Sequence, residues 1–167
     1  MIVLGILGFI IIALGDYNDA LLKNKLLKIS FPVGFLLIAA ATALNISRHF
    51  CFSLAWTIFA AVFLAALIYA LFGSFNTKDA YVKAGGKPEV YTKGLYSLCR
   101  HPGVLCFIGL YACLCPALGL SMSAAITYSA LNVILAAYED YFIFPKTLSG
   151  YDAYKKEVPF IVPRIKK

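Results

Sequence analysis

Five long apolar runs restrict the folds open to this chain. A helix needs roughly 20 residues to cross about 30 Å of hydrocarbon. With 62% hydrophobic and only 14% charged residues, the composition is that of an integral membrane protein. We therefore predict an all-α, polytopic transmembrane helical bundle of about five spans, or four if the first run does not cross. The runs cover residues 2–15, 29–46, 50–75, 103–120 and 121–144.

The chain divides into two halves at about residue 75. Residues 1–75 are predicted to be N-terminal transmembrane helices and carry no motif. Residues 76–167 contain a polar loop, two apolar runs and a basic tail. Only residues 119–123 separate these two runs, and they offer glycine and serine for a turn without adding a charge. We therefore predict a tight helical hairpin there.

Lysine and arginine predict the orientation, because basic residues favour cytoplasmic loops. Five spans place fourteen of the fifteen basic residues on one face and Arg48 alone on the other. The fourteen lie in residues 16–28, residues 76–102 and the tail. The C-terminus is therefore predicted to be cytoplasmic, and a four-span bundle leads to the same orientation. Since no basic residue precedes the first run, we expect no cleaved signal peptide.

The net charge of +7 does not indicate nucleic-acid binding. The charge is spread over the cytoplasmic ends of the spans, where anionic lipid is the nearer partner. The five cysteines match no zinc or disulfide spacing, so no metal site is predicted. Most of them are expected to pack as small hydrophobic residues. Cys99 adjoins a polar cluster and is either a buried thiol or a reactive one.

That polar cluster, directly before the fourth apolar run, predicts a binding site. Proline suits the first position of a helix and disfavours helix at the residue before it, so the helix should begin at Pro102. The free amides of its first turn, on Gly103 and the two residues that follow, would point toward water with the positive end of the helix dipole. Flanked by Arg100 and His101, this turn is a predicted seat for an anion.

The fifth run carries a second polar feature. Asn132 and Glu139 are seven residues apart and so share one helix face. A carboxylate inside a membrane usually finds a partner, and Arg100 enters from the same side. We therefore expect Glu139 to face Arg100 and His101, and Asp140 to point elsewhere. The alternative is that both acids lie at the interface and balance the basic tail.

Pro145 is predicted to end the fifth helix. The tail after it is typical of a short helix followed by an extended arm. Tyr151 and Tyr154 would share a helix face, and prolines favour an extended backbone over residues 158–163. This segment is either an aromatic and basic anchor at the membrane surface or a cap over a bound cofactor.

Residues 76–164 resemble the isoprenylcysteine carboxyl methyltransferase-like and phospholipid methyltransferase family of integral membrane enzymes. The resemblance implies a helical bundle that binds S-adenosylmethionine at the cytosolic face, enclosed by the Arg-His-Pro segment, the acidic end of the last span and the tail. It also implies a lipid or lipidated acceptor, such as the carboxylate of a prenylated cysteine. The residues that carry it form a Gly-x-Tyr-x-x-x-Arg-His-Pro pattern, an acid pair and a tail motif: Gly94, Tyr96, Arg100, His101, Pro102, Glu139, Asp140, Tyr151, Tyr154, Val158 and Pro163.

This resemblance makes Arg100 and Glu139 the candidate catalytic residues. Methyl transfer from a sulfonium is an in-line displacement that mainly needs alignment, so few groups are required. The first turn of the fourth helix suits the cofactor's carboxylate, Glu139 suits its ammonium or orients the acceptor, and a tyrosine could pack on the adenine. The candidate cofactor-binding residues are Tyr96, Arg100, His101, Pro102, Gly103, Glu139, Tyr151 and Tyr154.

The chain departs from the family pattern at two positions. Val104 stands where the family usually has tyrosine, and Asp140 where it usually has glutamate. Membrane sterol and steroid reductases, which use NADPH, have a similar C-terminal half, but Asn-Tyr usually follows their proline. A non-catalytic membrane protein of the same fold is a third alternative. Binding of S-adenosylmethionine, of NADPH or of neither distinguishes the three.

Overall fold

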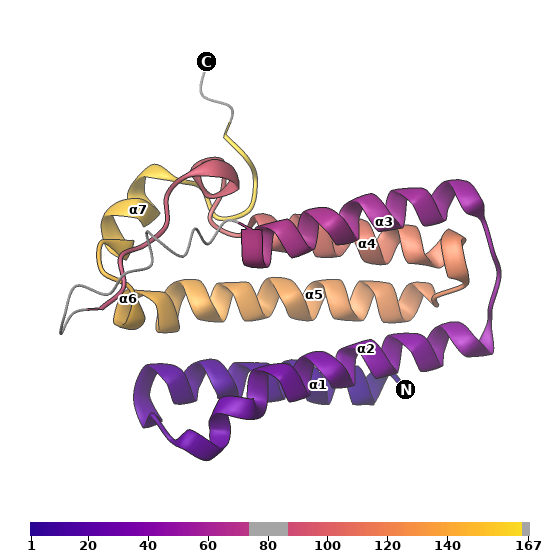
Figure 1. Cartoon of the computed structure of the whole chain (residues 1–167), viewed down its shortest axis with the longest axis horizontal. Coiled ribbons are helices and arrows are strands. Elements are labelled where there is room, and N and C mark those ends of the chain that lie inside the picture. Colours follow the sequence, from indigo (N-terminus) through magenta and orange to yellow (C-terminus); the bar gives the residue numbers. More distant parts are fainter. Residues whose placement is uncertain (74–86, 165–167) are drawn as a thin grey trace.

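The computed structural model describes residues 1–73 and 87–164, and within these ranges the chain forms helices and no strand. The predicted all-α class is therefore confirmed. Helix α5 lies between the pair α1 and α2 and the pair α3 and α4 (Figure 1). The five long helices are α1 (Ile2–Tyr17), α2 (Ser30–Arg48), α3 (Leu54–Ile68), α4 (Pro102–Leu118) and α5 (Met122–Tyr138).

Shorter helical segments extend or connect the long helices. Three of them are π-helical turns that continue α1, α3 and α5 without a break: η1 (Asn18–Leu22), η3 (Tyr69–Gly73) and η5 (Glu139–Ile143). The others are the 3₁₀ turns η2 (Lys25–Ile29) and η4 (Gly94–Ser97) and the helices α6 (Phe144–Thr147) and α7 (Tyr151–Glu157).

Within the described ranges, three helices are long and apolar enough to cross a membrane: Ile2–Leu22, Lys25–Arg48 and Leu54–Phe72. The first is longer than residues 2–15, because α1 runs to Tyr17 and η1 continues it to Leu22. Helix α4 is apolar but shorter, at 17 residues. Large apolar side chains on α3, such as Trp56, Phe59 and Val62, are exposed, as expected for a surface that contacts lipid.

Helices α1 and α2 pack with their backbones in direct contact. A Cβ atom added at Gly8 would lie 2.7 Å from the Gly34 carbonyl oxygen, and one at Gly34 would likewise meet the Gly8 carbonyl. Small residues that allow such an approach are typical of helix pairs in membranes, where van der Waals packing and not the hydrophobic effect drives association.

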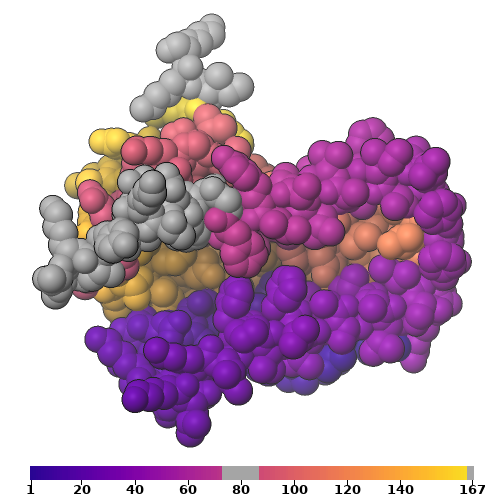
Figure 2. All heavy atoms as spheres, in the orientation of Figure 1, coloured from indigo at the N-terminus to yellow at the C-terminus, as the bar shows by residue number. Residues whose placement is uncertain are grey.

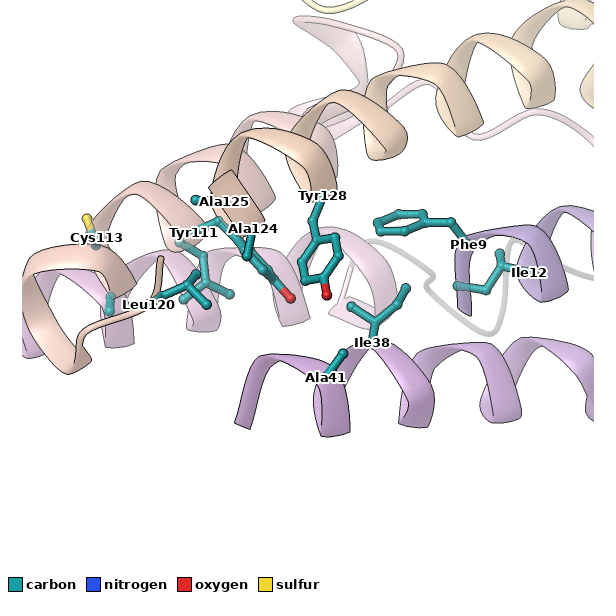
Figure 3. Close-up of a cluster of buried hydrophobic side chains, with 12 residues drawn as sticks. Phe9, Ile12, Ile38, Ala41, Tyr111, Cys113, Leu120, Ala124, Ala125 and Tyr128 are labelled. Atoms are coloured by element: carbon teal, nitrogen blue, oxygen red, sulfur yellow. The ribbon is translucent and has the colours of Figure 1, made fainter. Parts of the chain in front are cut away.

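The core lies where α5 meets both pairs. Tyr128 of α5 is fully buried and points toward Phe9 of α1 and Ile38 of α2 (Figure 3). Its hydroxyl donates to the Ile2 carbonyl at 3.4 Å. Between α2 and α3 the surface is hollowed, and atoms near the α4–α5 turn are visible in this groove (Figure 2).

The α1–α2 turn, the start of α4 and helices α6 and α7 lie at one end of the bundle, while the α2–α3 and α4–α5 turns lie at the other (Figure 1). The predicted α4–α5 hairpin is present, with α4 capped by Gly119 in the left-handed conformation. The boundary near residue 75 and four of the basic residues fall outside the described ranges: Lys78, Lys83, Lys166 and Lys167.

Pro145 does not end the fifth helix as predicted. The chain continues through η5 into α6, where Pro145 occupies the first turn. Proline is tolerated in a first turn because its missing N–H would have no partner there. The helical path therefore continues to Thr147 and brings the chain to α7.

Candidate functional site

Arg100 lies at the centre of the predicted site and binds two separate segments. Its Nε and Nη2 donate to the two carboxylate oxygens of Asp140, at 2.7 and 3.1 Å. Its Nη1 donates to the backbone carbonyls of Lys155 at 2.9 Å and Val158 at 2.6 Å. These four bonds leave one of the five guanidinium N–H groups for another partner. Arg100 therefore joins the end of α5 to the tail.

Asp140 is fully buried and has a complete set of partners. Besides the bidentate Arg100, it accepts a 2.5 Å bond from the Tyr151 hydroxyl and lies 3.0 Å from Lys155 Nζ. A buried carboxylate is tolerated when such donors replace the water it has lost. The expectation that Glu139 pairs with Arg100, and that Asp140 points elsewhere, is therefore wrong.

Glu139 faces α1 instead, where its carboxyl group is close to that of Asp16. The reason lies in the position of α5 between two neighbours. Consecutive residues on a helix point about 100° apart, so Glu139 meets α1 while Asp140 meets the start of α4 and the tail. Sequence periodicity separated the two acids correctly but could not say which neighbour lay on which side.

His101 lies between the two acids. Its Nδ1 is 4.0 Å from Glu139 Oε2, and its Nε2 is 3.4 Å from Asp140 Oδ1 without hydrogen-bond geometry. The ring stacks on Phe144 and meets the edge of Phe160. Burial lowers the pKa of His101 to about 4, although Asp140 acts in the opposite direction. The imidazole is therefore neutral at pH 7.

The three predicted tyrosines are joined to the chain through their hydroxyl groups. Tyr151 donates to Asp140, Tyr154 to the Tyr96 carbonyl at 2.6 Å, and Tyr96 to the Ala70 carbonyl at 3.1 Å. Burial raises the pKa of Tyr154, and burial with the Asp140 contact raises that of Tyr151. Tyr151 and Tyr154 share a helix face, as predicted, and their rings are 5.9 Å apart.

The segment after α7 is hydrogen-bonded through its backbone to the segment before α4. The amides of Arg100 and His101 donate to the Pro159 and Phe160 carbonyls at 2.9 and 3.1 Å. Farther along the arm, the Arg164 amide donates to the Leu98 carbonyl at 3.0 Å. The predicted helix is present, but residues 158–163 are not extended throughout: the chain bends at 158 and at 160–162 as it passes over the Arg-His-Pro segment.

The helix after this segment begins at Pro102, as predicted. Gly103 lies against the end of the α3 helix: a Cβ atom there would be 3.7 Å from Leu67 Cδ1 and 3.9 Å from Leu71 Cδ2. Gly103 therefore packs against apolar side chains of a neighbouring helix. These neighbours do not add to the prediction that Gly103 helps to bind an anion.

An opening of about 440 Å³ lies on the tail side of Arg100. Its lining contains four cationic side chains, one carboxylate and an apolar strip. It is a shallow depression that is largely open to solvent and not an enclosed cleft. The lining residues are Arg100, Lys155, Lys156, Glu157, Val158, Pro159, Val162, Pro163 and Arg164.

Cys99 is buried, and burial raises the pKa of its thiol, so the inert interpretation is favoured. The described residues contain no group of three or more side chains suited to a metal ion. Sequence reasoning missed Lys155 and Asp16. Lys155 was one of several tail lysines, and Asp16 stood at the end of a motif-free run, so nothing local marked either.

Comparison of the chain with known protein families, curated proteins and solved structures finds no match.

Proposed function

We propose that this protein is an integral membrane methyltransferase that uses S-adenosylmethionine and acts on a lipid or lipidated acceptor at the cytosolic face. One observation carries the proposal. The Arg-His-Pro segment, the acidic end of the last long helix and the tail, far apart in the sequence, meet at Arg100. These are the three segments that the family resemblance implies around the cofactor.

The opening beside Arg100 offers charged groups for the amino-acid end of this cofactor. S-adenosylmethionine carries one carboxylate together with an ammonium and a sulfonium, so the cations of the lining suit its carboxylate end, and Glu157 is the acid of the lining that suits its ammonium. Lys156 and Arg164, which belong to this lining, are the residues we assign to the carboxylate. Arg100 contributes its remaining N–H group and, above all, holds the tail in place.

The same proposal includes the topology. With α4 and α5 added to the three longer helices, the bundle has five spans and a cytoplasmic C-terminus, because fourteen of fifteen basic residues are then inside.

Titration of S-adenosylmethionine onto the full chain in detergent or nanodiscs tests this function. The wild type should bind, and the Lys156→Ala, Arg164→Ala double variant should bind about five- to 150-fold more weakly, because loss of a charged hydrogen bond costs about 1 to 3 kcal/mol. Lys25→Ala, an exposed change in the α1–α2 turn, is the matched control and should bind as the wild type does.

Titration of NADPH under the same conditions tests the competing class. Binding of NADPH without S-adenosylmethionine would replace the methyltransferase with a reductase. Absence of binding by both would indicate a non-catalytic protein. If S-adenosylmethionine binds but the double variant binds equally well, the cofactor site is elsewhere on the molecule.

A further inference from the structure

Asp16 of α1 is an acidic residue on a long apolar helix, in the half of the chain that carries no motif. Its Oδ2 atom is buried and has no hydrogen-bond partner among the described residues. The group that faces it is the carboxyl group of Glu139, at the end of α5. The two belong to helices that contact each other.

A proton shared by the Asp16 and Glu139 carboxyl groups would remove the repulsion between them. Two carboxylates in contact repel each other when both are charged, whereas a single proton between them makes one a donor and the other an acceptor. That proton would also satisfy the otherwise unpartnered Asp16 Oδ2, and a buried polar atom is rarely left without a partner. The pair would then carry one negative charge in total.

The Asp16–Glu139 pair lies next to His101, a buried residue of the candidate site. His101 is 7% exposed, and its Nδ1 lies 4.0 Å from Glu139 Oε2. Its Nε2 has no hydrogen-bond partner in the described chain. Asp16, Glu139, His101 and Asp140 thus form a continuous row from α1 to Arg100.

We propose that Asp16 is a positioning residue of the candidate site: it shares one proton with Glu139 and so fixes the charge and orientation of that carboxyl group beside His101. This inference rests on the proposed function for its effect on the cofactor, but the shared proton itself does not. The N-terminal helix therefore supplies part of the site.

Several other titratable groups surround the Asp16–Glu139 pair. They lie at the start of α4, in η4, around the junction of α1 and η1 and at the end of α5: His101, Tyr96, Tyr17, Asp19, Tyr138 and Asp140. Asp140 has its own cations, so it does not compete for the shared proton.

Infrared spectroscopy of the full chain in nanodiscs tests the shared proton. At pH 7 the wild type should show a protonated carboxylic-acid C=O band. Asp16→Asn and Glu139→Gln should each change the position of this band, and the double variant should abolish it. Asp152→Asn, which removes an exposed carboxylate from α7, is the matched control and should leave the band unchanged. A wild type without the band, or a double variant that keeps it, would overturn the proposal.

Binding of S-adenosylmethionine as a function of pH tests the role of Asp16. Asp16→Asn should weaken binding at least fivefold at pH 7 and change its pH profile, and Asp16→Glu should restore part of both, because it returns a carboxyl group. A purely structural role would leave the pH profile unchanged and would overturn the assignment. If the infrared result holds but the wild type binds no cofactor at any pH, the proposed function fails and Asp16 is left as a contact between helices.

Discussion

Asp140 is the side chain on which the candidate site depends most, because it neutralises Arg100 and Lys155 inside the protein. Asp140→Asn should lower the free energy of unfolding by on the order of 3 kcal/mol, since breaking a buried ion pair leaves an uncompensated charge. Thermal unfolding in detergent measures this loss, and limited proteolysis should show earlier cleavage in the tail. The exposed change Asp152→Asn should do neither. An equal effect of both substitutions would mean that the Asp140 contacts contribute little.

His101 should make stability depend on pH. Because burial lowers its pKa in the folded protein to about 4 from 6.5, the unfolded chain binds more protons between these values. The free energy of unfolding should therefore fall as pH decreases through this window, by roughly 1 to 3 kcal/mol. Thermal unfolding at pH 7 and pH 5 compares the wild type with His101→Gln, which should lose this part of the dependence. His49→Gln, at an exposed position, should keep it, and an unchanged pH slope in His101→Gln would contradict the argument.

The α1–α2 pair depends on the absence of side chains where its backbones meet. Gly8→Leu would place atoms against the Gly34 carbonyl and should cost about 1 to 3 kcal/mol, as overpacking does. Thermal unfolding again gives the measurement. Ile10→Leu, on the exposed face of the same helix, should be close to neutral. Wild-type stability of Gly8→Leu would show that the two helices can separate without loss.

The sequence predicted those features of the fold that depend on the backbone preferences of single residues. The start of α4 at Pro102 and its cap at Gly119 follow from the backbone preferences of proline and glycine. The path through Pro145 and the choice of Asp140 over Glu139 depend on the π-helical turn η5 and on the two neighbours of α5. Hydrophobic periodicity in a single sequence indicates neither the π-helical turn nor the helices that pack against α5. The pairing of Arg100 with Asp140 therefore could not be predicted from the sequence.

The number of spans depends on whether α4 and α5 cross the bilayer completely. At 1.5 Å per residue, α4 is only about 25 Å long, less than a typical hydrocarbon core. Cysteine labelling in intact membranes, in a Cys51→Ser background, decides this. Lys28→Cys and Lys156→Cys should react from the cytoplasmic side, and Arg48→Cys and Met122→Cys from the opposite side. If Met122→Cys reacts from the same side of the membrane as Lys156→Cys, α4 and α5 form a re-entrant hairpin and not two spans.

The contacts of the tail also determine when the site can exist during biosynthesis. Arg100 and Asp140 enter the bundle with α4 and α5, but Tyr151, Lys155 and the carbonyl of Val158 are translated after every helix of the bundle. Until the tail has been synthesised and has folded back, Asp140 lacks two of its donors and Arg100 two of its acceptors. The ion cluster around Arg100 is therefore complete only after the tail has folded onto the start of α4 and the end of α5.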